Sequence, residues 1–218
     1  MWNDLSNIWK EAFSLAWDAY TKNTIPIGAV IVNEEGKIIS RGKNRIYDRE
    51  SNSPLAGTQM AHAEVSAMIN LRDLDHPNVN QYALFSTMEP CPMCFGTMVI
   101  MGIRELNYAA KDGYGGATEL NEKLEYIKIK KLRINRESGE LEVFQICLQS
   151  VFEFSRIKAK SNRVIDSWRE YCNDGVELAV QLYEENYFSI AVESKKTIEV
   201  VYDEVLERYH HLQLEKIN

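Results

Sequence analysis

Four residues combine side-chain types and spacing that suit metal-assisted chemistry: His62, Glu64, Cys91 and Cys94. One histidine and two cysteines supply three ligands of a tetrahedral zinc ion and leave the fourth position open for water, as catalytic zinc sites do. Glu64 lies two residues after His62, which places a carboxylate near the metal without making it a ligand. The pattern predicts one Zn²⁺ per chain, bound by His62, Cys91 and Cys94, with Glu64 as the proton carrier.

Two other interpretations of these residues need to be weighed. A Cys-x-x-Cys pair alone also suits a redox pair or half of a structural zinc site. A structural site needs a fourth ligand, and the remaining histidines and cysteines lack ligand spacing: His76, Cys147, Cys172, His210 and His211. We expect Cys147 and Cys172 to be small buried hydrophobes, and the adjacent His210 and His211 to lie on the surface.

The two motifs together match the signature of zinc deaminases, because His62-Ala63-Glu64 is followed by Pro90-Cys91-Pro92-Met93-Cys94. Residues 25–32 and 42–45, with Gly96 and Met98, extend the match. Over about residues 8–157 the sequence resembles the cytidine deaminase-like superfamily, in the branch of tRNA adenosine, guanine and fungal-type cytosine deaminases. The resemblance implies a three-layer α/β fold, a five-stranded mixed sheet flanked by helices, zinc bound at two helix N-termini, and a homodimer.

The resemblance also implies roles for site residues. Asn44 matches an asparagine that hydrogen-bonds the substrate base or sugar, although a turn-forming asparagine after a strand fits this position equally well. Four further residues are predicted to line the substrate site: Ile27, Ala63, Glu89 and Pro90. The Cys91 amide, at a helix start, is expected to hold the forming oxyanion.

The expected reaction is hydrolytic deamination, in which oxygen replaces an exocyclic amine of a nucleobase and ammonia is released. Zinc acidifies a water molecule, and Glu64 takes its proton and later protonates the ring nitrogen and the departing amine. The chain carries 25 Lys and Arg against 32 Asp and Glu, a net charge of −7. This acidity, together with a loop between Asn44 and His62 that is longer than in tRNA deaminases, favours a small free base or nucleoside as the substrate.

Two alternatives remain open. The first is adenosine-to-inosine deamination of tRNA, which residues 25–30 and 111–118 resemble, with the basic stretch Lys128–Arg136 as a possible phosphate contact. One departure argues against tRNA: the Arg-rich end of the last helix in that family survives only as Phe152, Phe154, Arg156 and Lys158. The second is a non-catalytic binding module with a deaminase fold, which would have been expected to lose Glu64 or a metal ligand.

The elements that position these residues follow from hydrophobic periodicity and turn residues. We expect a deaminase domain over residues 1–157 and a helical C-terminal extension over 158–218, with no signal peptide, no membrane span and a cytoplasmic location. Helices are predicted at about 8–20, 61–71, 92–101 and 140–157, and strands at 25–32, 37–40, 82–88, 106–110 and 127–134, the last with a bulge at Lys130 and Lys131. Residues 44–60 form a long loop, and residues 112–118 a glycine-rich turn.

Overall fold

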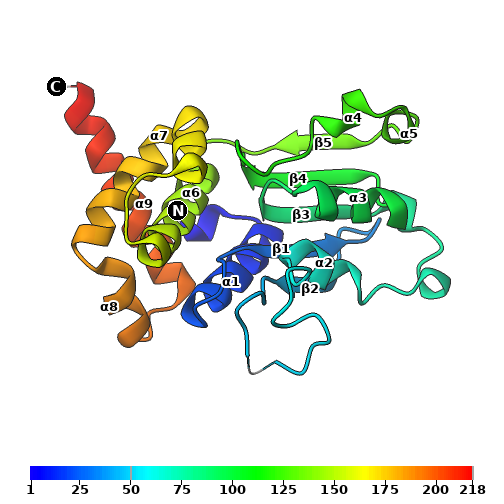
Figure 1. Cartoon of the computed structure of the whole chain (residues 1–218), viewed down its shortest axis with the longest axis horizontal. Coiled ribbons are helices and arrows are strands. Elements are labelled where there is room, and N and C mark those ends of the chain that lie inside the picture. The colour runs from blue at the N-terminus through cyan, green and yellow to red at the C-terminus, as the bar shows by residue number, and fades with distance from the viewer. Residues whose placement is uncertain (50, 218) are drawn as a thin grey trace.

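The computed structural model describes residues 1–49 and 51–217, and it contains a five-stranded sheet with helices on both faces (Figure 1). The strand order is β2-β1-β3-β4-β5. Strand β1 pairs antiparallel with β2 and β3, whereas β3 and β4, and β4 and β5, pair in parallel. This mixed sheet confirms the predicted fold class. The strands are β1 (Gly28–Val32), β2 (Ile38–Lys43), β3 (Ala83–Met88), β4 (Glu105–Ala110) and β5 (Arg133–Arg136).

Two buried clusters cover the two faces of the sheet. Helix α1 (Asn7–Thr21), capped by the Ser6 side chain, packs with α6 (Glu140–Ile157) in one cluster. Helices α2 (Ala63–Met68) and α3 (Pro92–Met101) pack in the other. The result is a three-layer molecule with the sheet in the middle.

A glycine allows β2 to approach α2 closely. A Cβ atom on Gly42 would lie 2.1 Å from the Ala63 carbonyl oxygen and 2.3 Å from the Ala67 nitrogen. No side chain fits in this space, so the backbone of β2 contacts the first turn of α2 directly. This contact fixes the position of His62 and Glu64 relative to the sheet.

The chain after residue 157 is helical, as predicted. It forms α7 (Arg163–Glu184), α8 (Tyr187–Glu193) and α9 (Ile198–Ile217), which gather with α6 at one end of the molecule (Figure 1). Tyr202 of α9 is fully buried, and its ring lies 4.7 Å from that of Phe144 and 5.9 Å from that of Phe13. One cluster therefore crosses residue 157, and the division into two domains there stays a proposal.

The predicted strand over 127–134 is wrong in its first half. Residues 120–128 form two short helices, α4 (Leu120–Lys123) and α5 (Glu125–Lys128), and only β5 is a strand. Strand β5 pairs with β4 over residues 133–136 alone, so the preceding residues have no strand partner and bond locally, as when Ile129 N donates to Glu125 O. Lys131, with φ of 53°, turns the chain into β5.

Several predicted boundaries also shift. Strand β1 begins at Gly28 rather than residue 25, because Pro26 lacks an N–H group and Ile27 N donates to Ile25 O in a tight turn. Helix α2 is shorter than predicted, because the Asn70 side chain donates to the Ser66 carbonyl, which would otherwise accept the next helical bond. Short 3₁₀ turns occupy Trp2–Asp4, Asp73–Asp75 and Val79–Gln81. Within the described residues, no helix is long and apolar enough to cross a membrane.

Candidate active site

The three predicted ligands meet at the first turns of α2 and α3. His62 Nδ1 lies 3.6 Å from Cys91 Sγ and 3.4 Å from Cys94 Sγ, and the two sulfurs are 3.6 Å apart. Tetrahedral ligands held at zinc distances stand roughly 3.5–3.8 Å from one another. This donor set therefore fits a zinc ion and leaves one coordination position without a protein ligand.

Helix α3 begins where the cysteines are needed. Cys91 is its N-cap, and Pro92 occupies the first helical position, where its missing N–H group costs nothing. Both sulfurs thus lie at the positive end of a helix dipole, which favours thiolate. The sulfur–sulfur hydrogen bond with Cys94 lowers the pKa of Cys91 to about 4, and the His62 ring acts in the same direction. The same bond raises the pKa of Cys94, and the Cys91 contact raises the pKa of His62.

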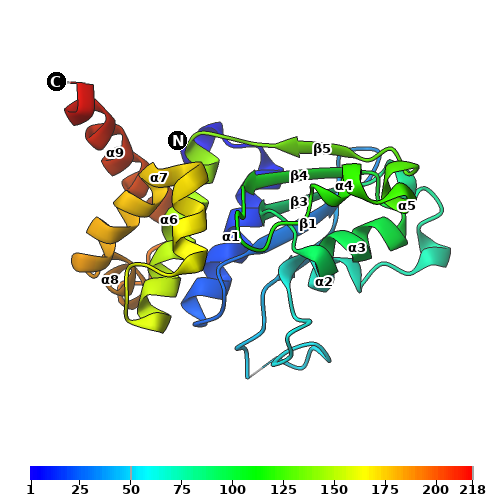
Figure 2. The ribbon, with the colours of Figure 1, turned by 45° about the horizontal axis from the view of Figure 1, so that its top comes forward.

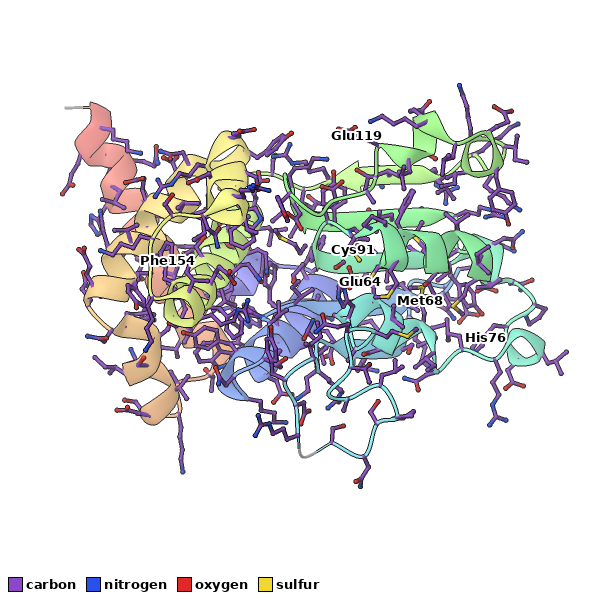
Figure 3. All side chains as sticks on the ribbon, viewed as in Figure 1. Glu64, Met68, His76, Cys91, Glu119 and Phe154 are labelled. Atoms are coloured by element: carbon purple, nitrogen blue, oxygen red, sulfur yellow. The ribbon has the colours of Figure 1, made fainter. Side chains whose placement is uncertain are left out.

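Glu64 lies beside this cluster (Figure 3). Its side chain is buried, and its Oε2 is 3.5 Å from Cys94 Sγ. Burial raises the pKa of Glu64 above the usual range of a glutamate. A carboxyl group with a raised pKa is suited to accept a proton and return it near neutral pH.

Asn44 follows β2 and is almost fully buried. Its Oδ1 accepts hydrogen bonds from the Thr24 hydroxyl and from Ile46 N, each at 3.0 Å. The contact with Ile46 is the turn interaction that the sequence left open. Both contacts use Oδ1, so the Nδ2 amide remains as the donor on which the predicted substrate role of Asn44 depends.

Ile27 and Ala63, two of the other predicted substrate contacts, lie next to residues of the site. The Ile27 carbonyl accepts from Asn44 N at 3.0 Å, and Ala63 opens α2 directly after His62. Both residues therefore adjoin the site through the backbone, and their substrate contacts stay predictions.

Glu89 and Pro90 are occupied by the turn over residues 111–118. The Glu89 side chain is fully buried, and its carboxylate accepts from Lys111 Nζ at 3.0 Å and from Asp112 N and Thr118 N at 3.1 Å. The Pro90 carbonyl accepts from Ala117 N at 3.0 Å. The Glu89 carboxylate is thus held by internal donors, and the substrate contacts expected of Glu89 and Pro90 stay predictions.

A groove of about 950 Å³ lies near Asn44, between the C-terminal end of α1, residues 46–49 and the C-terminal end of α6. Arg156 Nη1 donates to the Tyr47 hydroxyl at 2.9 Å, and its guanidinium lies 5.6 Å from the centre of that ring. Asp48 also lines the groove and pairs with Arg45 at 3.0 Å. Three cationic and two aromatic side chains contribute to its wall: Lys22, Arg49, Arg156, Tyr47 and Phe152.

Sequence analysis singled out Phe152 and Arg156 but missed the rest of this groove. Tyr47 and Arg156 are separated by 109 residues, so no local pattern links them. Thr24, which is buried and holds Asn44, was also missed, since an isolated threonine carries no sequence signal.

Comparison with known proteins places these features in a family. The sequence profile of the cytidine and deoxycytidylate deaminase zinc-binding region matches residues 3–110. The tRNA-specific adenosine deaminase of Rickettsia bellii is 37% identical over 114 residues, which are 51% of this chain and 74% of that protein. The tRNA-specific adenosine deaminase of Bacillus subtilis is 34% identical over 110 residues, 50% of this chain and 63% of that protein.

A solved structure supports the fold. The protein NE0047 in complex with 2,6-diaminopurine is 20% identical and superposes with a TM-score of 0.52, covering 66% of this chain and 79% of its own. The three predicted metal ligands and Glu64 all lie inside the segment that matches the family profile. The chain belongs to the cytidine and deoxycytidylate deaminase family, within the cytidine deaminase-like superfamily.

Proposed function

We propose that this protein is a zinc-dependent hydrolytic deaminase that converts adenosine to inosine in tRNA. The reaction consumes water, replaces the amine of the purine ring with oxygen and releases ammonia. The observation that carries the proposal is the cluster of His62, Cys91 and Cys94 beside the buried Glu64. The choice of tRNA is supported by relatives of 37% and 34% identity that are tRNA-specific adenosine deaminases.

Each residue of the site has a separate task in this reaction. His62, Cys91 and Cys94 would hold the zinc ion, which would supply a Lewis acid that lowers the pKa of water. Glu64 accepts a proton at a carboxylate oxygen and returns it to the ring nitrogen and then to the leaving amine. Asn44 Nδ2 donates a hydrogen bond to the substrate, and the Cys91 amide stabilises the developing negative charge on oxygen.

The groove supports an RNA substrate. Single-stranded nucleic acid is bound by cations that follow the backbone and by aromatic rings on which bases stack. Lys22, Arg49 and Arg156 supply the charge, and Tyr47 and Phe152 supply the rings. The net charge of −7 describes the whole chain, whereas RNA binding depends on the local distribution of charge. In the groove, Lys22 pairs with Asp18 and Arg156 with Glu153, and the side chain of Arg49 adds a third cation.

A free base or nucleoside is the second candidate. It is favoured by the overall acidity of the chain and by the length of the loop between Asn44 and His62. It needs only the metal cluster, Glu64 and Asn44, and makes no use of the groove.

The two candidates are separated by ammonia release and by mass spectrometry of the product. Zinc-loaded protein is offered a tRNA anticodon stem-loop containing adenosine, the same stem-loop lacking it, and free bases and nucleosides, with Glu64→Ala as the blank. We expect inosine in the adenosine-containing stem-loop. Turnover of small molecules alone would overturn the tRNA proposal in favour of the second candidate.

The groove gives a second prediction. Arg156→Ala removes one phosphate-binding cation, so kcat/KM on the stem-loop should fall about tenfold, and the salt dependence of binding should flatten by about one unit of slope. Arg208→Ala, which removes a cation of α9 paired with Glu185, is the matched control and should change neither. Equal effects of the two substitutions would show that the groove does not bind RNA.

A further inference from the structure

The turn over residues 111–118 forms a wall next to the metal-binding segment. Strands β3 and β4 are parallel, so Cys91, which follows β3, and the turn, which follows β4, emerge at the same edge of the sheet. Glu89 accepts from both ends of the turn, at Asp112 N and Thr118 N. A Cβ atom on Gly116 would lie 2.1 Å from Glu89 Oε2, so the turn packs directly on this carboxylate.

Helix α7 of the C-terminal extension packs against the other side of this turn. Figure 2 shows α7 beside the end of β4 that leads into the turn. Trp168 Nε1 donates to Asp112 Oδ1 at 3.1 Å, and its side chain is buried. A Cβ atom on Gly113 would lie 2.7 Å from both the Ser167 carbonyl oxygen and the Tyr171 ring. The turn is therefore held between the metal-binding segment and α7.

One oxygen joins the two sets of contacts. Asp112 Oδ1 accepts from Tyr114 N and Gly115 N, each at 3.1 Å, as well as from the Trp168 indole. The first two bonds shape the turn from within, and the indole ties it to α7. Hydrogen bonds to a carboxylate are among the stronger ones in proteins, so loss of the indole donor removes a specific constraint on the turn.

We propose that Trp168 is a positioning residue of the deamination reaction. Through Asp112 it fixes the turn over residues 111–118, and through Glu89 and Pro90 the turn fixes Cys91 at the start of α3. The extension then helps to set the geometry of the active site, although Trp168 itself touches neither metal nor substrate. For its kinetic readout the inference rests on the proposed deaminase activity.

The test compares two tryptophans that make the same kind of bond. Trp168→Phe keeps an aromatic ring and removes the indole donor to Asp112. Trp17→Phe is the matched control, because Trp17 Nε1 also links the deaminase part to the extension, donating to the Lys196 carbonyl at 3.2 Å, but outside the turn. Amide hydrogen exchange of the turn, the visible spectrum of the cobalt-substituted protein, kcat and KM are measured for both.

For Trp168→Phe we expect exchange in residues 111–118 to rise about tenfold, the value of one net hydrogen bond. We also expect an altered cobalt–thiolate band in the visible spectrum and a kcat about tenfold lower, with little change in KM. Trp17→Phe should leave all four at the wild-type values. Unchanged exchange and spectrum in Trp168→Phe, equal changes in both variants, or faster exchange with unchanged kcat would each overturn the inference.

Two features keep the test decisive. Exchange and the cobalt spectrum are read without substrate, so they test the inference even if the wild-type protein deaminates no RNA, which would refute only the proposed function. If Trp168→Phe does not fold, Asp112→Asn weakens the bond from Trp168 together with those from Tyr114 N and Gly115 N, and it should change exchange and the spectrum in the same direction. An Asp112→Asn protein identical to wild type in these two readouts would contradict the positioning role.

Discussion

At the scale of single residues, the side chains proposed to bind metal differ from the one proposed to transfer protons. His62, Cys91 and Cys94 bring their donor atoms within 4.8 Å of one another. Glu64 contacts this cluster through Cys94, and burial raises the pKa of its carboxyl group. Removal of the carboxyl group and removal of a ligand should therefore have separable effects.

We expect Glu64→Ala to keep stoichiometric zinc and to lose turnover by about 100-fold to 10,000-fold, the usual contribution of a positioned acid–base group. Cys91→Ala should lose the metal, because a site with two protein ligands binds zinc weakly. Zinc content by mass spectrometry and ammonia release together check both outcomes. Full turnover by Glu64→Ala would contradict the assignment of Glu64.

At the scale of elements, the close packing of β2 against α2 sets the position of the site. Gly42 allows the strand backbone to meet the backbone of Ala63 and Ala67. The element that carries His62 and Glu64 is thus set against the sheet by a missing side chain.

Gly42→Ala places a methyl group into this contact, and we expect it to lower the free energy of unfolding by about 3 kcal/mol, the upper end of the usual cost of overpacking. Gly96→Ala is the matched control, since apart from its chain neighbours and the backbone of its own helix no described atom lies within 4 Å of the added Cβ. In the middle of α3 it should stabilise by up to about 1 kcal/mol through helix propensity. Urea unfolding of both variants measures the difference, and equal stabilities would contradict the backbone contact.

At the scale of the whole molecule, the extension shares its core with the deaminase part. Phe13, Phe144 and Tyr202 meet in one fully buried ring cluster. Helices α7 and α9 therefore cover apolar surface on α1 and α6 that would otherwise face water.

A chain ending at Ile157 exposes this surface, so we expect it to aggregate or to lose its cooperative thermal transition. A chain ending at Leu212 keeps the buried part of α9 and should stay folded. Differential scanning calorimetry compares the two truncations. A cooperative transition in the shorter chain would show that residues 1–157 fold alone and would support a domain boundary there.

The homodimer expected from the resemblance stays a prediction, and α3 offers a surface for it. Ile100 is 71% exposed on this helix, whose residues are mostly apolar. If a second copy packs there, Ile100→Glu should give monomers in light scattering, because the dimer would bury the glutamate charge without a partner. Ile190→Glu, at an isoleucine of α8 that is 52% exposed, is the control. A dimer that survives Ile100→Glu would place the interface elsewhere.

The chemistry proposed for the site was predictable from the sequence alone. The ligand types, the position of Glu64 and the helix start at Pro92 depend on side-chain identity and short spacing along the chain. The bounds of α6 followed from the same local rules, since its apolar residues repeat with the helical period.

The contacts between residues far apart in the chain could not be predicted from the sequence. Lys128 lies in a helix rather than a strand, because β5 pairs with β4 over residues 133–136 alone. The local alternation of Ile and Lys does not show how long this pairing is. The burial of Glu89, the groove around Tyr47 and Arg156, and the bond between Trp168 and Asp112 join residues that are 22 to 109 positions apart. Such contacts depend on how helices and strands pack, and this packing is settled only when the whole core forms.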